Sequence, residues 1–132
     1  MKYVFTAVFT TDESGKVYAR VPDLKGCVTT GDSIEDAIDM VTDAMNLWLV
    51  TAEDEGYAIP APTPQLSIQH DKDAAFSLIQ ADTIKYRKET DTKAVRKNVS
   101  LPAWMFKMAD KLNVNCSQVL QDSLLNIFEA SK

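Results

Sequence analysis

Residues suited to metal or redox chemistry are scarce in this sequence. Its 132 residues include two cysteines and one histidine. Cys27 and Cys116 lie far apart and form no C-x-x-C motif, and they cannot build a zinc site with His70 at the usual ligand spacings. The four glycines are dispersed and form no phosphate-binding loop. We therefore expect a protein with no metal and no cofactor.

Long apolar runs are also missing. No stretch approaches the roughly 18 consecutive apolar residues that mark a membrane-spanning helix. Residues 1–15 alternate polar and apolar side chains and lack the apolar core of a signal peptide. With 45% apolar and 25% charged residues, the composition is that of an ordinary globular protein. These features predict a soluble cytoplasmic protein that binds no membrane.

Charge is distributed unevenly along the chain. The net charge of −5, taken alone, argues against binding to nucleic acid, which requires a basic surface. Residues 1–84 contain 5 basic and 14 acidic residues, a net charge of −9. Residues 85–132 contain 9 basic and 5 acidic residues, a net charge of +4. This division indicates two units, the first suited to a basic partner and the second to an acidic one.

The first part of the chain has the pattern of an α+β domain. Alternating apolar residues predict strands at 3–10, 16–21, 27–30 and 75–81. A long helix follows the third strand, with Asp32 and Glu35 as its capping box and Gly56 as its stop. The apolar stripe expected to face the core comprises Ile34, Ile38, Val41, Met45 and Trp48.

A charged segment without apolar periodicity, residues 85–93, is the best candidate for a linker. We therefore divide the chain into a domain of residues 1–84, this linker, and a second domain of residues 94–132. The second domain is predicted to contain one strand and two short helices. Its strand alternates over residues 95–101 and ends at Pro102, which starts the first helix.

Helix boundaries in the second domain are marked by asparagine. Asn113 is suited to the left-handed conformation that ends a helix. Asn115 and Gln118 form a capping box for the second helix. A lone strand leaves its backbone groups unpaired, and so small a domain cannot bury these apolar faces by itself. We therefore expect a homodimer in which two strands pair antiparallel; an ordinary helical hairpin packed on the first domain remains the alternative.

Two paired strands form a ribbon that fits the major groove of DNA. Arg96, Asn98 and Ser100 would lie on its outward face, and these residue types read base edges. Lys93 and Lys97 would add positive potential. The amino end of the second helix would offer backbone N–H groups to phosphate. The expected DNA-binding residues are Lys93, Arg96, Lys97, Asn98, Ser100, Asn115 and Ser117.

Residues 95–102, V-R-K-N-V-S-L-P, followed by two helices, resemble a ribbon-helix-helix domain of the Arc and MetJ type. Asn113 replaces the usual glycine between the helices, and Cys116 stands where many members carry a basic residue. Residues 18–29, Y-A-R-V-P-D-L-K-G-C-V-T, and residues 31–37, G-D-S-I-E-D-A, resemble the loop and helix start of the antitoxin family HicB. That family usually has Pro-Asp-Leu-Pro-Gly-Cys and Gly-Asp-Thr-x-Glu-Glu-Ala at these places.

The resemblance implies a fold and two partners. The first domain would be a β-β-β-α-β unit similar to a partial RNase H fold. It would bind and block HicA, a small basic toxin that cleaves RNA. The second domain would bind operator DNA and repress the chain's own operon, with a tetramer as a further possibility.

Acidic residues gather at the loop and along the outer face of the predicted helix. By charge complementarity they are candidates for binding a basic toxin. These candidates are Asp23, Asp32, Glu35, Asp36, Asp39 and Asp43. The alternative is a solvated helix face whose carboxylates favour the helix N-terminus.

Other functions have weaker support in the sequence. An RNase H-like nuclease could use Mg²⁺ with Asp12, Asp23 and Asp32, although two of these have local turn or cap roles. A Ser-His-Asp triad with His70 lacks a nucleophile elbow, and Cys27 is expected to be a buried small apolar residue. A stand-alone repressor with a sensing N-terminal domain is the remaining alternative.

Overall fold

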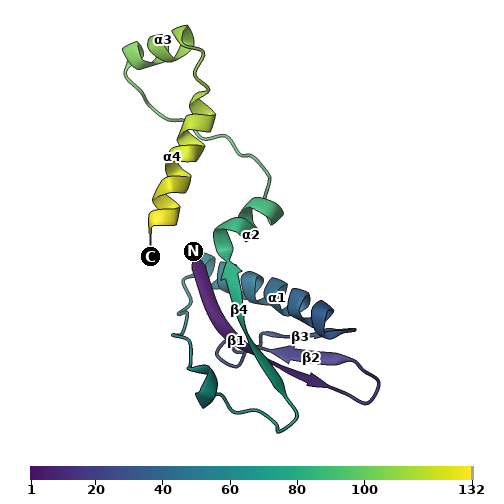
Figure 1. The fold of residues 1–132 in the computed structure, drawn as a ribbon. Helices are drawn as coiled ribbons and strands as arrows, with labels where there is room; N and C mark the ends of the chain where they lie inside the picture. Colours follow the sequence, from purple (N-terminus) through teal and green to yellow (C-terminus); the bar gives the residue numbers. More distant parts are fainter. Residues whose placement is uncertain (132) are drawn as a thin grey trace. The chain divides into compact units, whose positions relative to one another are not determined.

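The computed structural model describes residues 1–131 (Figure 1). The chain divides into two compact units, Lys2–Glu89 and the part from Thr90 onward. The first contains a four-stranded sheet, a long helix and a short helix, and the second contains two helices. No helix within residues 1–131 combines the length and the apolar character needed to cross a bilayer.

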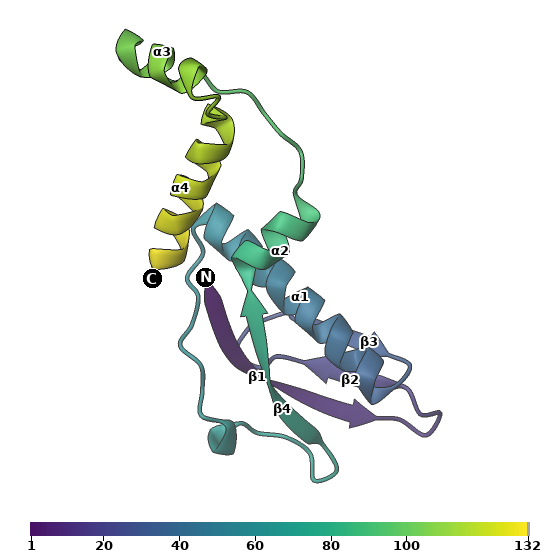
Figure 2. The same cartoon turned by 45° about the horizontal axis from the view of Figure 1, so that its top comes forward.

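The first unit is an antiparallel sheet with one long helix packed on one face (Figures 1 and 2). The strands lie in the order β3-β2-β1-β4, so β1 is central and β4 is an edge strand. Its elements are β1 (Lys2–Thr11), β2 (Val17–Arg20), β3 (Val28–Gly31), α1 (Ile34–Glu55), η1 (Gln65–Ser67), β4 (Ala75–Asp82) and α2 (Thr83–Thr90). The predicted β-β-β-α-β order is therefore present.

The core of this unit lies between the sheet and α1. Alternation along β1 places Phe5, Ala7 and Phe9 in the core cluster, where Met45 and Leu49 of α1 also lie. The predicted stripe of α1 is partly wrong. Val41 and Met45 are buried as predicted and Trp48 packs against the core, but Ile34 and Ile38 are 41% and 36% exposed. The other buried residues of α1 are Ala37, Asn46, Leu49 and Ala52.

Gly31 explains why the buried face of α1 begins at a small residue. A Cβ atom added at Gly31 would lie 2.4 Å from the backbone nitrogen of Ala37, so the end of β3 and the first turn of α1 are in direct contact. Only a glycine leaves room for this approach. Ala37 is fully buried at this contact, whereas Ile34 and Ile38 remain exposed.

The N-terminal cap of α1 lies one residue later than predicted. Ser33, not Asp32, is the N-cap, because Ser33 has the extended backbone that a cap requires (φ −148°, ψ 172°). Its Oγ accepts a hydrogen bond from the Asp36 backbone N–H at 3.1 Å. The Asp36 carboxylate in turn accepts from the Asp32 N–H at 2.9 Å. At the other end, Gly56 adopts the left-handed conformation (φ 75°), as expected for the stop.

The predicted linker, residues 85–93, is wrong in its first part, because α2 continues through Thr90. The helix is capped by Asp82, whose Oδ1 accepts from the Lys85 N–H at 3.1 Å. Arg87 of α2 forms ion pairs with Glu53 and Asp54 at 3.1 and 2.9 Å. Arg87 of this charged segment is thus held by two carboxylates of α1. The sequence pattern could not indicate this contact.

The second unit contains α3 (Ala103–Lys111) and α4 (Cys116–Ala130). Pro102 is the N-cap of α3 and not its first helical residue. Asn113 has a positive φ of 56°, as predicted, and the Oδ1 of Asn115 accepts from the Gln118 N–H at 3.1 Å. The strand expected at 95–101 does not form within the single chain. A strand needs a hydrogen-bonding partner, and the described chain offers no partner strand to this segment.

Candidate interaction sites

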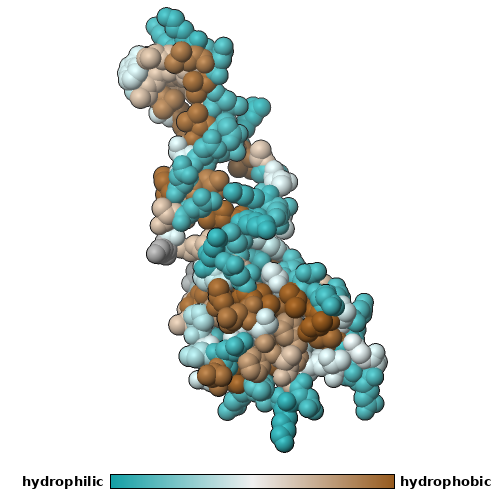
Figure 3. Space-filling view, in the orientation of Figure 1, coloured by the Kyte–Doolittle hydropathy of each residue, from teal (hydrophilic) through white to brown (hydrophobic). Residues whose placement is uncertain are grey.

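The second unit lacks a core of its own. Between residues 90 and 131 no residue is buried, and Ala109 and Leu125 alone reach intermediate burial. Large apolar side chains are exposed on both helices, and Figure 3 shows apolar patches on its surface. On α3 these are Trp104, Met105, Phe106 and Met108, and on α4 they are Val119, Leu120, Leu124, Ile127 and Phe128. Exposed apolar surface on this scale marks an interaction site.

The segment that precedes α3 holds most of the expected DNA-binding residues. Lys93, Arg96, Lys97, Asn98 and Ser100 are all exposed, and they lie in a stretch that is neither helix nor strand. The single chain therefore presents these side chains without a fixed face. Val95, Val99 and Leu101 alternate with these polar residues along the chain and are also exposed.

The last two expected DNA-binding residues lie at the start of α4. Asn115 uses its side-chain oxygen to cap this helix, so that oxygen is engaged within the chain. Ser117 is exposed in the first helical turn. The N–H groups of this turn are those that a helix leaves without an intrahelical partner, and they suit an anion.

Five of the six predicted acidic residues form a continuous exposed face at the start of α1. The residues Asp36, Asp39 and Asp43 follow each other at spacings of three and four, which places them on one side of the helix. Asp32 and Glu35 lie beside them at the amino end, and all five are exposed. We call these residues the acidic face: Asp32, Glu35, Asp36, Asp39 and Asp43.

The acidic face also touches α2. Burial raises the pKa of the Tyr86 phenol, and the neighbouring Asp43 carboxylate raises it further. The negative charge of Asp43 disfavours formation of a phenolate next to it. Asp43 therefore has a contact with α2, and the Asp36 carboxylate is bonded to the Asp32 N–H.

Asp23, the sixth candidate, lies outside this face and makes hydrogen bonds within the unit. Its Oδ2 accepts from the Thr63 N–H at 2.8 Å, and its Oδ1 accepts from the Thr63 hydroxyl at 2.6 Å. Both oxygens thus hold the segment that contains Pro60, Pro62 and Pro64 against the loop of residues 22–27, which joins β2 to β3. The indole N–H of Trp48 donates to the Lys25 carbonyl at 3.0 Å and ties the same loop to α1.

Cys27 lies in this loop as a buried apolar residue, as expected. It is 4% exposed and belongs to the core cluster. Burial raises the pKa of its thiol to about 11, which disfavours the thiolate that nucleophilic chemistry needs. The loop is therefore a scaffold for the sheet and α1.

The carboxylates of the nuclease alternative serve separate local structures. Asp12 Oδ1 accepts from the Ser14 hydroxyl at 2.6 Å and from the Ser14 and Lys16 N–H groups, and these bonds lower its pKa. Asp23 binds Thr63, and Asp32 lies at the start of α1. Within residues 1–131 no three His, Cys, Asp or Glu side chains gather as metal ligands would. The His70 ring packs against the Phe76 ring, with centroids 4.7 Å apart and the ring planes inclined at 46°.

The sheet face opposite α1 is a surface that the sequence patterns did not single out. Val4, Tyr18, Val28 and Leu78 are between 42% and 65% exposed there, although Val8 beneath them is buried. A groove of about 450 Å³ crosses β1, β2 and β3 on this side. The sequence nevertheless carried an indication of this surface. Apolar residues occur at both the odd and the even positions of β1, a pattern that indicates a strand covered on both faces.

Known proteins resemble this chain in sequence and in fold. Residues 5–123 match the family described as HicB_like antitoxin of bacterial toxin-antitoxin system. The UPF0150 protein ssr1765 of Synechocystis sp. is 33% identical over 58 residues, which are 44% of this chain and 73% of that protein.

Solved structures share the fold over nearly the whole length. A chain of a toxin-antitoxin complex from Streptococcus pneumoniae superposes with a TM-score of 0.61 and 19% identity, covering 96% of this chain and 99% of that one. The antitoxin HicB of Burkholderia pseudomallei superposes with a TM-score of 0.53 and 20% identity, covering 98% of both chains. At these identities the likeness concerns the fold.

Proposed function

Since this chain belongs to the family of HicB-like antitoxins of bacterial toxin–antitoxin systems, we propose that it neutralises a HicA-like RNA-cleaving toxin and represses its own operon by binding operator DNA. Inhibition of the toxin is steric and electrostatic, and this chain performs no chemistry. The first unit binds the toxin and the second unit binds DNA as a ribbon-helix-helix homodimer.

The observation that carries the DNA-binding half is the absence of any buried residue between 90 and 131. A unit whose helices expose their apolar faces gains stability by covering them with a second copy. Pairing of the two 94–101 segments then supplies each strand with the hydrogen-bonding partner that a single chain lacks. The charge of this part of the chain, +4 over residues 85–132, suits the phosphate backbone.

In the paired ribbon the alternation of side chains assigns each residue a role. Val95, Val99 and Leu101 face the helices, and Arg96 and Asn98 face the major groove, where they read base edges. Ser100 shares their face, whereas Lys93 and Lys97 contribute positive potential. The first turn of α4, at Asn115 and Ser117, holds a phosphate through backbone N–H groups, since the Asn115 oxygen already caps the helix.

The toxin-binding half rests on the acidic face of α1. Its five carboxylates are exposed, and the first 84 residues carry a net charge of −9, which complements a basic partner. Asp23 is left out of this surface, because both of its oxygens bind Thr63.

Two variants separate the halves of this function. Arg96→Ala should weaken operator binding by roughly 1–3 kcal/mol and relax sequence choice, measured by gel shift across salt concentrations, and should leave toxin binding unchanged. Glu35→Lys combined with Asp39→Lys should weaken co-purification with the toxin encoded beside this chain, and should leave the gel shift unchanged. The control is Asp73→Lys, which reverses the charge of an exposed residue outside α1. If Arg96→Ala abolished toxin binding in a folded protein, the division of labour would be wrong.

A further inference from the structure

The outer side of α1 carries two large apolar side chains that face solvent. Met40 is 45% exposed and Leu47 is 54% exposed. Positions seven residues apart on a helix lie on the same side, about 10 Å from each other along the axis. The residues Val41, Met45 and Ala52 lie on the buried side of the helix. Met40 and Leu47 therefore form an apolar pair on the surface, which we call the outer pair.

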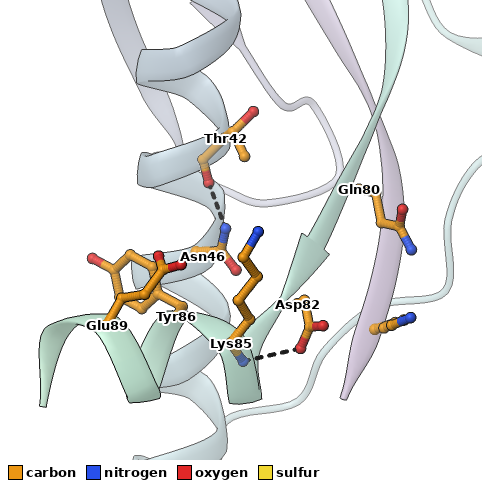
Figure 4. A pocket seen from close by; sticks show the side chains of 8 residues that line it. Thr42, Asn46, Gln80, Asp82, Lys85, Tyr86 and Glu89 are labelled. Atoms are coloured by element: carbon orange, nitrogen blue, oxygen red, sulfur yellow. Dashed lines mark hydrogen bonds between the residues drawn. The ribbon is translucent and has the colours of Figure 1, made fainter. Parts of the chain in front are cut away.

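The short helix α2 leaves the outer pair open. It lies beside a different flank of α1, where Thr42 and Asn46 share a cleft with Tyr86 (Figure 4). Neither Met40 nor Leu47 lines this cleft. Isolated apolar residues are common on protein surfaces, so the function of the outer pair depends on the charges around it.

The charge around the outer pair has one sign. The sequence of α1 contains seven acidic residues and no lysine or arginine. The acidic residues are Glu35, Asp36, Asp39, Asp43, Glu53, Asp54 and Glu55. Arg87 of α2 pairs with Glu53 and Asp54. Within residues 1–131 no ion pair involves Asp36, Asp39 or Asp43, so these carboxylates are available to the cations of a partner.

The spacing along α1 interleaves these charges with the outer pair. Side chains three and four residues apart are neighbours on a helix. Asp36 and Asp43 are therefore neighbours of Met40, and Asp43 is also a neighbour of Leu47. A second copy of this chain that used the same surface would place carboxylates opposite carboxylates, which is unfavourable. A basic protein with an apolar patch fits the surface without that repulsion.

We propose that Met40 and Leu47 anchor the basic toxin, with apolar side chains of the toxin packed against them and its lysines and arginines against the flanking carboxylates. This inference rests on the proposed function of the first unit and adds two contact residues to the acidic face. The two kinds of contact act on different rates. Charges at the edge of an interface speed association, whereas buried apolar contacts slow dissociation.

Surface plasmon resonance of the immobilised full chain, with the toxin encoded beside it as analyte, separates these rates. Leu47→Ala and Met40→Ala should each raise the dissociation rate about tenfold and leave the association rate nearly unchanged. Glu35→Gln combined with Asp39→Asn should slow association about threefold and weaken its dependence on salt. Leu66→Ala, at a leucine 95% exposed in the first unit, is the matched control and should change neither rate.

The outcomes separate the outer pair from the proposed function. Alanine favours helices, so both variants of the exposed outer pair should keep their fold, and equal midpoints of urea denaturation check this. Unchanged dissociation rates in both alanine variants, alongside slower association in the charge variant, would overturn the role of the outer pair alone. Loss of self-association in Leu47→Ala with unchanged toxin kinetics would assign the surface to a second copy and would also refute the proposal.

Two further results would reach beyond the outer pair. If no variant changed either rate, the toxin would bind elsewhere, and both the outer pair and the acidic face would be wrong. If the natural chain did not bind the toxin at all, the proposed function itself would fail.

Discussion

At the scale of single residues, Glu53 attaches α2 to α1. Its Oε2 accepts from the Tyr3 hydroxyl at 2.7 Å and from the Thr83 hydroxyl at 3.1 Å. Its Oε1 accepts from Arg87 at 3.1 Å. The Glu53 side chain is 18% exposed, so these bonds are only partly open to competition from water. One carboxylate thus joins α1, α2 and the start of β1.

Replacing this carboxylate tests that role. Glu53→Gln keeps the size of the side chain but removes its charge and one acceptor, and should lower the free energy of unfolding by about 1–3 kcal/mol. Urea denaturation followed by fluorescence in a Trp104→Phe background makes Trp48 report on the first unit. Glu55→Gln, two residues away and exposed, should have little effect. Equal stabilities of the two variants would contradict the role given to Glu53.

Tyr3 gives this contact a pH dependence. Burial, with the hydrogen bond to Glu53 and its charge, raises the pKa of Tyr3 to about 12 from its ordinary value of 10. The folded state therefore binds the phenolic proton more tightly than the unfolded state. This contribution to stability is fully present below pH 10 and is lost as the pH rises towards 12. Urea denaturation between these values should show a steeper loss of stability in the natural chain than in Tyr3→Phe.

At the scale of elements, helix caps could be predicted from residue type, whereas the buried face of α1 could not. Gly56, Asn113 and Asn115 end or begin helices as their residue types predict, because each cap depends on its own backbone conformation and the nearest N–H groups. The buried face of α1 depends instead on where the helix meets the sheet. At that meeting point Gly31 and Ala37 are in close contact and Ala37 is buried, whereas Ile34 and Ile38 are exposed.

The cap of α4 is testable by itself. Asn115→Ala removes the oxygen that accepts from the Gln118 N–H, and should destabilise α4 by about 1 kcal/mol. Thermal unfolding of the full chain, followed by circular dichroism at a helix band, measures the loss. Asn126→Ala, in the exposed middle of the same helix, should be neutral or slightly stabilising, because alanine favours helix interiors. A larger loss in Asn126→Ala than in Asn115→Ala would contradict the capping role.

At the scale of the whole molecule, the two units differ in how they bury apolar residues. The first has a core of its own, to which the sheet, the loop that carries Cys27 and α1 all contribute. The second has two well-capped helices and no buried residue between 90 and 131. Local signals are therefore sufficient for its helices, whereas no core within this unit holds the two helices together.

A substitution on α4 tests the proposed homodimer. Leu124→Glu places a charge among the exposed apolar residues of α4, and burying an unpaired charge in an interface is strongly unfavourable. Light scattering after size-exclusion chromatography should show a shift from dimer or larger species to monomer at micromolar concentration. Leu66→Glu, at a leucine 95% exposed in the first unit, should leave the assembly unchanged. A stable dimer in Leu124→Glu would count against pairing through the second unit.

The sequence by itself determined the order of the strands and the long helix of the first unit, the helix caps at Gly56, Asn113 and Asn115, and the division of charge between the two parts of the chain. These features depend on residue type and short spacings, which local backbone chemistry interprets directly. Only the tertiary structure decided that Asp23 binds Thr63, that Arg87 binds Glu53, and that Asn46 Oδ1 is buried without a hydrogen-bond partner among the described residues. Each of these contacts joins residues far apart in the chain or depends on burial, which no local pattern encodes.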